Sequence, residues 1–226
     1  MPIHLKREID KLKRKLLSLS AITEDQVRRS VKSIEQRDIQ LAKEVIHGDT
    51  EVDRAEVEIE EDCLKILALH QPVAVDLRFI VALLKINNDL ERIGDLAVNI
   101  ARKAATLASQ PPLTVPFDLA EMSERAQAML RDSLDSLVNL DTSLALNVCA
   151  RDDEVDRMKR AIRHQVEEML RNTPEHISLL LKLLAASRNI ERIADLATNI
   201  AEDVIYMVEG KIIRHRAEDD SLPAKR

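Results

Sequence analysis

Glycine and aromatic residues are scarce in this chain of 226 residues. It contains three glycines, one tyrosine, two phenylalanines and no tryptophan, although 45% of its residues are hydrophobic. Strands favour aromatic and β-branched side chains, and tight hairpins need glycine at positive φ. These shortages argue against a β-sandwich, a barrel and a nucleotide-binding α/β fold. The glycines also stand far apart, so no glycine-rich phosphate loop can be assigned. An all-α protein with an aliphatic core remains.

Cysteine motifs, an excess of positive charge and long apolar runs are missing as well. Cys63 and Cys149 have no metal-ligand spacing and predict reduced thiols. The 34 basic and 40 acidic residues give a formal net charge of −6, which argues against nucleic-acid binding. The first residues do not resemble a secretory signal, and the most apolar stretch, residues 177–187, is short and contains Lys182. We therefore expect a cytoplasmic protein that does not cross a membrane.

Hydrophobic periodicity predicts six helices. Apolar residues recur at alternating spacings of three and four, which is typical of helices that pack on other helices. Asp38 and Asp141 are predicted N-caps, and Pro72 and Pro174 are expected to interrupt two helical runs. The predicted helices cover residues 3–36, 38–70, 73–108, 117–139, 141–171 and 175–209.

The two halves of the chain are related in sequence. Adding 103 to the residue number maps residues 30–54 onto residues 133–157 with 11 identities in 25 positions. Adding 100 maps residues 88–101 onto residues 188–201 with 9 identities in 14 positions. Such internal repetition indicates a tandem duplication of a three-helix unit.

A proline-rich segment separates the two copies. Three prolines between residues 109 and 116 predict a stiff linker and exclude a continuous helix there. We therefore predict two tandem three-helix bundles, one in residues 1–110 and one in residues 111–226. The last residues, 216–226, are polar, and we expect this end of the chain to be frayed.

Five polar positions recur in both copies, spaced four apart along two neighbouring helices of each bundle. Residues four apart share one helix face, and a like-charged pair there costs about 0.2–0.5 kcal/mol. Their recurrence at matched places calls for a compensating cation. The positions are Asp49, Asp53, Glu91, Asp95 and Asn99 in the first copy and Asp152, Asp156, Glu191, Asp195 and Asn199 in the second.

Chain reversal at Pro72 brings the acids of the first copy to one level. Residues equidistant from the turn of an antiparallel pair lie side by side, which places Asp49 beside Asp95 and Asp53 beside Glu91. This level lies about 30 Å from the turn, and the second copy repeats the arrangement at its own proline. Carboxylate and amide oxygens suit hard cations. The sequence therefore predicts a metal site on a solvent-facing flank of each bundle, for Fe, Mn, Mg, Zn or Ca.

Two other interpretations remain open. In one, the acids pair with neighbouring arginines in a solvated salt-bridge face of a structural helical module that binds no metal. In the other, the same clusters serve a metalloenzyme, although the sequence contains no evident nucleophile, tuned general acid or substrate pocket. The arginines considered for the salt bridges are Arg54, Arg92, Arg157 and Arg192.

Two matched segments resemble a known family. Residues 88–101 and residues 188–201, both built on Glu-Arg-Ile-x-Asp-Leu-Ala-x-Asn-Ile-Ala, resemble the paired signature of the PhoU family of phosphate-transport regulators. Residues 71–78 also resemble the turn before that family's third helix. Many members carry His directly after the motif aspartate, where this chain has Leu96 and Leu196. An imidazole ligand is therefore absent at both positions.

The resemblance implies a fold, a site and a role. It implies two three-helix bundles in a cytoplasmic, often dimeric protein, with metal clusters at the Glu/Asp-x-x-x-Asp motifs. It also implies negative regulation of phosphate uptake and of the phosphate-starvation response, without enzymatic activity. The implied partners are a phosphate ABC transporter, through its ATPase or permease, and a phosphate-sensing histidine kinase, so that contact with the membrane is through proteins only.

Apolar residues off the main stripe of the third helix hint at a further interface: Leu84, Leu96 and Val98.

Overall fold

The protein is built from six long helices. The structure is a computed structural model that describes residues 3–210, and this part of the chain contains no strand, as the sequence predicts. The predicted frayed end, residues 216–226, lies outside the described residues. The helices are α1 (Ile3–Glu35), α2 (Ile39–His70), α3 (Ala74–Ala108), α4 (Leu119–Asn139), α5 (Thr142–Asn172) and α6 (Ile177–Glu209), with a 3₁₀ turn, η1 (Pro174–His176), before α6.

Aspartate side chains start three of the helices. Asp38 accepts a hydrogen bond from the amide of Leu41, and Asp141 accepts from the amides of the second and third residues that follow it. Both N-caps are as predicted. The start expected at residue 117 is wrong by two residues, because Asp118 caps α4 by accepting from the amides of Ala120 and Glu121. The two interrupting prolines lie where α2 gives way to α3 and α5 gives way to α6.

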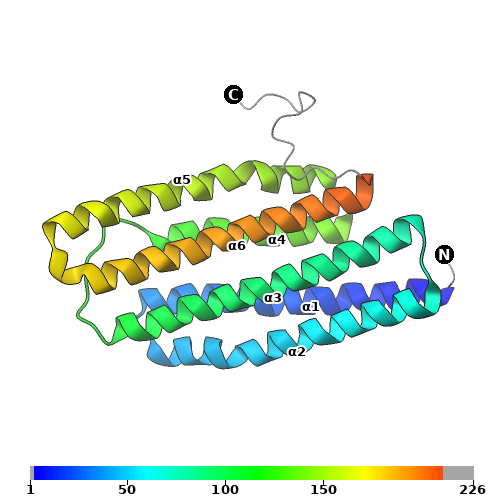
Figure 1. Ribbon diagram of the computed structural model, residues 1–226, viewed down its shortest axis with the longest axis horizontal. Coiled ribbons are helices and arrows are strands. Elements are labelled where there is room, and N and C mark those ends of the chain that lie inside the picture. Colours follow the sequence, from blue (N-terminus) through cyan, green and yellow to red (C-terminus); the bar gives the residue numbers. More distant parts are fainter. Residues whose placement is uncertain (1–2, 211–226) are drawn as a thin grey trace.

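The helices form two three-helix bundles that pack along their lengths. Figure 1 shows α1, α2 and α3 in one bundle and α4, α5 and α6 in the other, with α3 and α6 antiparallel at the junction. One hydrophobic core runs through both bundles and includes residues from all six helices. Leu96 and Val98 are buried within the single chain. The burial of these two residues removes them as evidence for an interface with a second chain. The homodimer itself stays a prediction.

Small polar residues also lie in the interior of the bundles. Ser30 and its repeat equivalent Ser133 are fully buried, and each hydroxyl donates to the carbonyl three residues earlier. Cys63 and Cys149 are free, as predicted. In residues 3–210, no helix has a stretch long and apolar enough to cross a membrane.

Candidate functional site

The first acidic cluster lies between α2 and α3. Burial raises the pKa of Asp49, and the nearby carboxylates of Asp53 and Asp95 raise it further. Burial also raises the pKa of Glu91, with added repulsion from Asp95, Asp53 and Asp49. These four side chains therefore feel one another's charge, as the antiparallel register around the turn requires. Gly94 permits the close approach, because a Cβ there would lie 3.2 Å from Cγ1 of Val52.

The second acidic cluster occupies the equivalent place between α5 and α6. Partial burial raises the pKa of Asp195 to about 6, and Glu191, Asp152 and Asp156 raise it in the same direction while Lys159 opposes them. The pKa of Asp152 is raised by burial as well. The side chain of Asp195 still reaches solvent, so the cluster is accessible from outside.

A hollow between α3 and α6 connects the two clusters. Its volume is about 310 Å³, and both repeats contribute the same four residue types to its lining. The sequence predicts separate sites on separate bundles. The packing of α3 on α6 instead places residues of both clusters around one hollow. The residues that line the hollow are Arg92, Asp95, Leu96, Asn99, Arg192, Asp195, Leu196 and Asn199.

The carboxylates are neighbours without forming a closed chelate. In residues 3–210, no group of three or more His, Cys, Asp or Glu side chains is gathered tightly enough to hold a metal ion. The donor chemistry fits a hard cation, because each cluster offers four carboxylates and an amide oxygen. A cation would require these side chains to turn toward one another.

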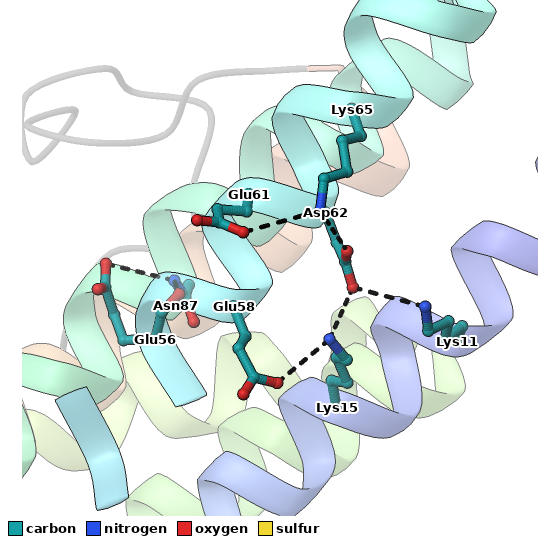
Figure 2. Close-up of polar contacts among 8 residues, drawn as sticks. All are labelled: Lys11, Lys15, Glu56, Glu58, Glu61, Asp62, Lys65 and Asn87. Carbon is teal, nitrogen blue, oxygen red and sulfur yellow. Dashed lines mark hydrogen bonds and ion pairs between the residues drawn. The ribbon is translucent and has the colours of Figure 1, made fainter. Parts of the chain in front are cut away.

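An ordinary ion-paired acid on the same helix shows how unusual the first cluster is. Figure 2 shows Asp62 of α2 between Lys11 and Lys15 of α1, with the Lys15 ammonium 2.7 Å from the Asp62 carboxylate. The hydrogen bond from Lys15 lowers the pKa of Asp62. Asp49 and Glu91 show the opposite shift. An acid of the first cluster is therefore held among like charges.

Ion pairs of the kind that the salt-bridge interpretation expects occur only in the second cluster. The basic residues that make them differ from the four arginines that the sequence suggested. Arg92 pairs with Asp89 at 3.2 Å and not with the first cluster. In the second cluster, the Lys159 ammonium lies 2.5 Å from the Glu191 carboxylate, and the Arg160 guanidinium lies 3.1 Å from the Asp156 carboxylate. Among the described residues, Arg54, Arg157 and Arg192 make no ion pair.

Sequence reasoning missed two residues of the first cluster. Glu56 of α2 adds to the negative charge at Glu91. Gln26 of α1 is buried with an amide that has no hydrogen-bond partner, close to Asp49. Glu56 could have been found from its place one turn after Asp53. No signal in the sequence distinguishes Gln26 from other polar residues of its helix.

Both bundles of the chain match a known protein family. The family model described as the PhoU domain matches the chain twice, over residues 16–104 and 119–204. The chain belongs to the PhoU family. The two matches fall on the two bundles, and the predicted family and the predicted two-bundle fold are both confirmed. The exact domain limits, residues 1–110 and 111–226, stay a prediction.

The relatives span most of the chain. A protein from Aquifex aeolicus, named phosphate-specific transport system accessory protein PhoU homolog, is 37% identical over 93% of this chain and 95% of its own length. A Pseudomonas aeruginosa protein of the same name is 38% identical over 92% of this chain and 86% of its own length. These names describe accessory proteins and agree with the prediction of a protein that is not an enzyme.

Solved structures of family members have the same fold. The crystal structure of PhoU from Pseudomonas aeruginosa superposes with a TM-score of 0.87 at 35% identity, covering 91% of this chain and 99% of that one. A regulatory PhoU protein from Streptococcus pneumoniae gives the same TM-score at 24% identity over 92% of this chain and 99% of its own, which supports the fold alone.

Proposed function

We propose that this chain is a non-enzymatic regulator of phosphate transport that acts in the cytoplasm and binds divalent or ferric cations at its acidic clusters. Family membership and the names of the relatives support the role in phosphate transport. One observation carries the cation-binding part: the four carboxylates of the first cluster repel one another. In the described part of the chain, no hydrogen bond or ion pair offsets that repulsion.

The proposal extends to partner proteins. As the family resemblance implies, the chain would bridge a phosphate ABC transporter and a phosphate-sensing histidine kinase, and would lower phosphate uptake and the starvation response. Long helices whose exposed faces carry varied polar residues suit an adaptor, since each face can contact a different protein. A homodimer, also implied by the family, would present each face twice.

A bound cation would join α2 to α3 through the side chains of the first cluster. Asp49 and Asp53 would supply carboxylate oxygens from α2, and Glu91 and Asp95 would supply them from α3. Asn99, one turn after Asp95, would add an amide oxygen. The cation would neutralise the like charges and hold the two helices together. Occupancy of the site would thereby affect the surface that α2 and α3 offer to partners.

Elemental analysis of the purified protein tests the proposal. The wild-type chain should contain a divalent or ferric metal, and replacing Glu91 and Asp95 together by alanine should remove at least half of it, because the first cluster loses two of four carboxylates. Glu168→Ala, at an exposed position of α5 away from both clusters, is the matched control and should leave the metal content unchanged. Equal metal content in the double variant and the wild type would contradict the assignment of these ligands.

A further inference from the structure

The contacts of the repeated acids differ between the two clusters. In the second cluster, Lys159 donates to Glu191 at 2.5 Å, and Arg160 donates to the carboxylate of residue 156 at 3.1 Å. Thr198 donates to the carboxylate of residue 152 at 3.3 Å. Three of the four acids thus have a donor from the chain itself. In the first cluster, within residues 3–210, no hydrogen bond or ion pair reaches any of the four acids.

The difference follows from three positions at which the repeats diverge. Lys159 and Arg160 correspond to Glu56 and Val57 in the first copy, and Thr198 corresponds to Val98. None of these first-copy residues can donate a side-chain hydrogen bond to a carboxylate at neutral pH. Where the second cluster has an ammonium group, the first therefore has a fifth carboxylate.

The charge of Glu56 acts on the first cluster directly. It raises the pKa of Glu91, together with the cluster's own acids. Figure 2 shows the Glu56 carboxylate beside Asn87 of α3, whose side-chain nitrogen lies 3.5 Å from it. Arg102 lowers the pKa of Asp49 through space, and within residues 3–210 it makes no hydrogen bond or ion pair to that acid. Glu56 therefore adds negative charge to acids that, among the described residues, have no hydrogen bond or ion pair of their own.

Gln26 is an independent sign that the first cluster takes a ligand. It is only 5% exposed, and neither its Oε1 nor its Nε2 has a hydrogen-bond partner. A Cβ on Gly94 would lie 3.5 Å from Oε1 of Gln26 and 3.6 Å from Oδ1 of Asp49, so the amide oxygen points into the space beside the cluster. A Cβ on Gly48 would lie 3.4 Å from Nε2. Leaving such an amide unpaired in the interior costs about 1–3 kcal/mol.

The second copy has no counterpart of this buried amide. Gln26 corresponds to Met129, and the two glycines beside it correspond to Arg151 and Ala194. Arg151 binds Asp132 of α4 instead of extending toward the second cluster. The glycine-lined space and the amide oxygen are therefore features of the first cluster alone.

We infer that the first cluster is the preferred cation site, with Gln26 and Glu56 as additional oxygen donors, and that Lys159 is a built-in counter-ion which a cation must displace from the second cluster. This inference rests on the proposed cation binding. A hard cation gains most where several carboxylates lack partners, and it gains least where a lysine already satisfies one of them.

Reciprocal charge swaps test the inference. Mn²⁺ titrated into metal-free protein, followed by calorimetry, should show a tight and a weak class of site. Glu56→Lys, which copies the second repeat, should weaken the tight class at least tenfold. Lys159→Glu, which copies the first, should strengthen the weak class by a similar factor. The same titrations with Fe²⁺ under anaerobic conditions should rank the variants in the same order.

The outcomes separate the inference from the proposed function. If the wild type binds neither Mn²⁺ nor Fe²⁺, the proposed cation binding fails, and the inference fails with it. If the wild type binds either ion but both clusters bind it equally, or the two swaps leave the affinities unchanged, the inference alone is overturned.

Gln26→Met distinguishes a ligand from a structural residue. Methionine is the residue of the second repeat, and it removes an unpaired amide from the interior. The metal-free variant should therefore melt at the same temperature as the wild type or higher, while its tight Mn²⁺ class weakens about tenfold. Gln26→Glu keeps an oxygen donor and should restore tight binding. Wild-type affinity in Gln26→Met would overturn the role of this residue.

Discussion

At the scale of single residues, the neighbours of a carboxylate decide what it can do. Asp62 is neutralised by lysines of α1, and Lys15 lowers its pKa. Asp195 is surrounded mainly by other acids and by protein, and its pKa rises to about 6. Both lie on long amphipathic helices, and their local sequences do not reveal the difference. An acid whose charge is unfavourable in the folded chain is one that gains from a cation.

The raised pKa of Asp195 predicts a pH-dependent stability of the metal-free protein. A carboxyl group with a raised pKa favours folding fully below its unfolded value, near 3.8, and that contribution is lost as the pH rises through about 6. The stability of the wild type relative to Asp195→Asn should therefore fall between pH 4 and pH 6. Solvent screening at this accessible side chain limits the loss to about 1 kcal/mol.

Urea denaturation in the presence of chelator, repeated from pH 4 to pH 7.5, measures this loss. The comparison with Asp195→Asn cancels the titration of the other acids, to the extent that they do not interact with residue 195. A difference between the two proteins that stays constant with pH would contradict the assignment. Glu168→Gln, at an exposed position of α5, serves as the control and should follow the wild type.

At the scale of helices, short signals in the sequence set the boundaries. Asp141 accepts hydrogen bonds from the amides of Ser143 and Leu144, and the repeat equivalent Asp38 caps α2. Because both acids are fixed relative to the next proline, the register of each helical hairpin is fixed as well. That register brings Asp49 level with Asp95 without any information about the rest of the fold.

Removal of the N-cap of α5 should destabilise the protein. Asp141→Ala leaves two amides at the start of α5 without their side-chain acceptor, so the free energy of unfolding should fall by about 1 kcal/mol. Urea denaturation measures the loss. Glu168→Ala, at an exposed position near the C-terminal end of α5, should change the stability by less than about 0.5 kcal/mol. Equal losses in both variants would show that the cap contributes nothing beyond a general effect of alanine.

At the scale of the whole molecule, the two repeats meet through their third helices. α3 and α6 run antiparallel at the junction (Figure 1), and both carry Asp and Asn side chains into the hollow between them. Each bundle therefore holds its own acids between two of its helices, and the hollow lies where the two bundles meet. A cation in either cluster would change the charge that the other one meets.

Cation binding should stabilise the whole fold. A ligand that binds only the folded chain adds about 2.7 kcal/mol at a hundred times its Kd. Thermal melting of protein saturated with Mn²⁺ should therefore show a higher Tm than melting in excess chelator. The variant with Glu91 and Asp95 both replaced by alanine should lose at least half of this increase. A wild-type Tm that does not respond to chelator or to added cation would contradict the proposed function.

The sequence by itself determined the helices, their caps, the duplication and the level of the acids. These features depend on local periodicity, on proline and on distance from a turn, which the chain carries in its order of residues. Leu96 and Val98 show where this reasoning ends. Their apolar character suggested a further interface, and only the packing of the helices showed that they are buried within the chain.

Only the tertiary structure decided how the two clusters differ. The isolated amide of Gln26 depends on how α1 packs against two glycines of other helices, and the contact of Lys159 with Glu191 depends on the approach of α5 to α6. Side chains from different helices meet only after the helices have packed, and no spacing along one helix encodes that contact. The matched acids could therefore be predicted from the repeat, whereas the partners of each acid could not.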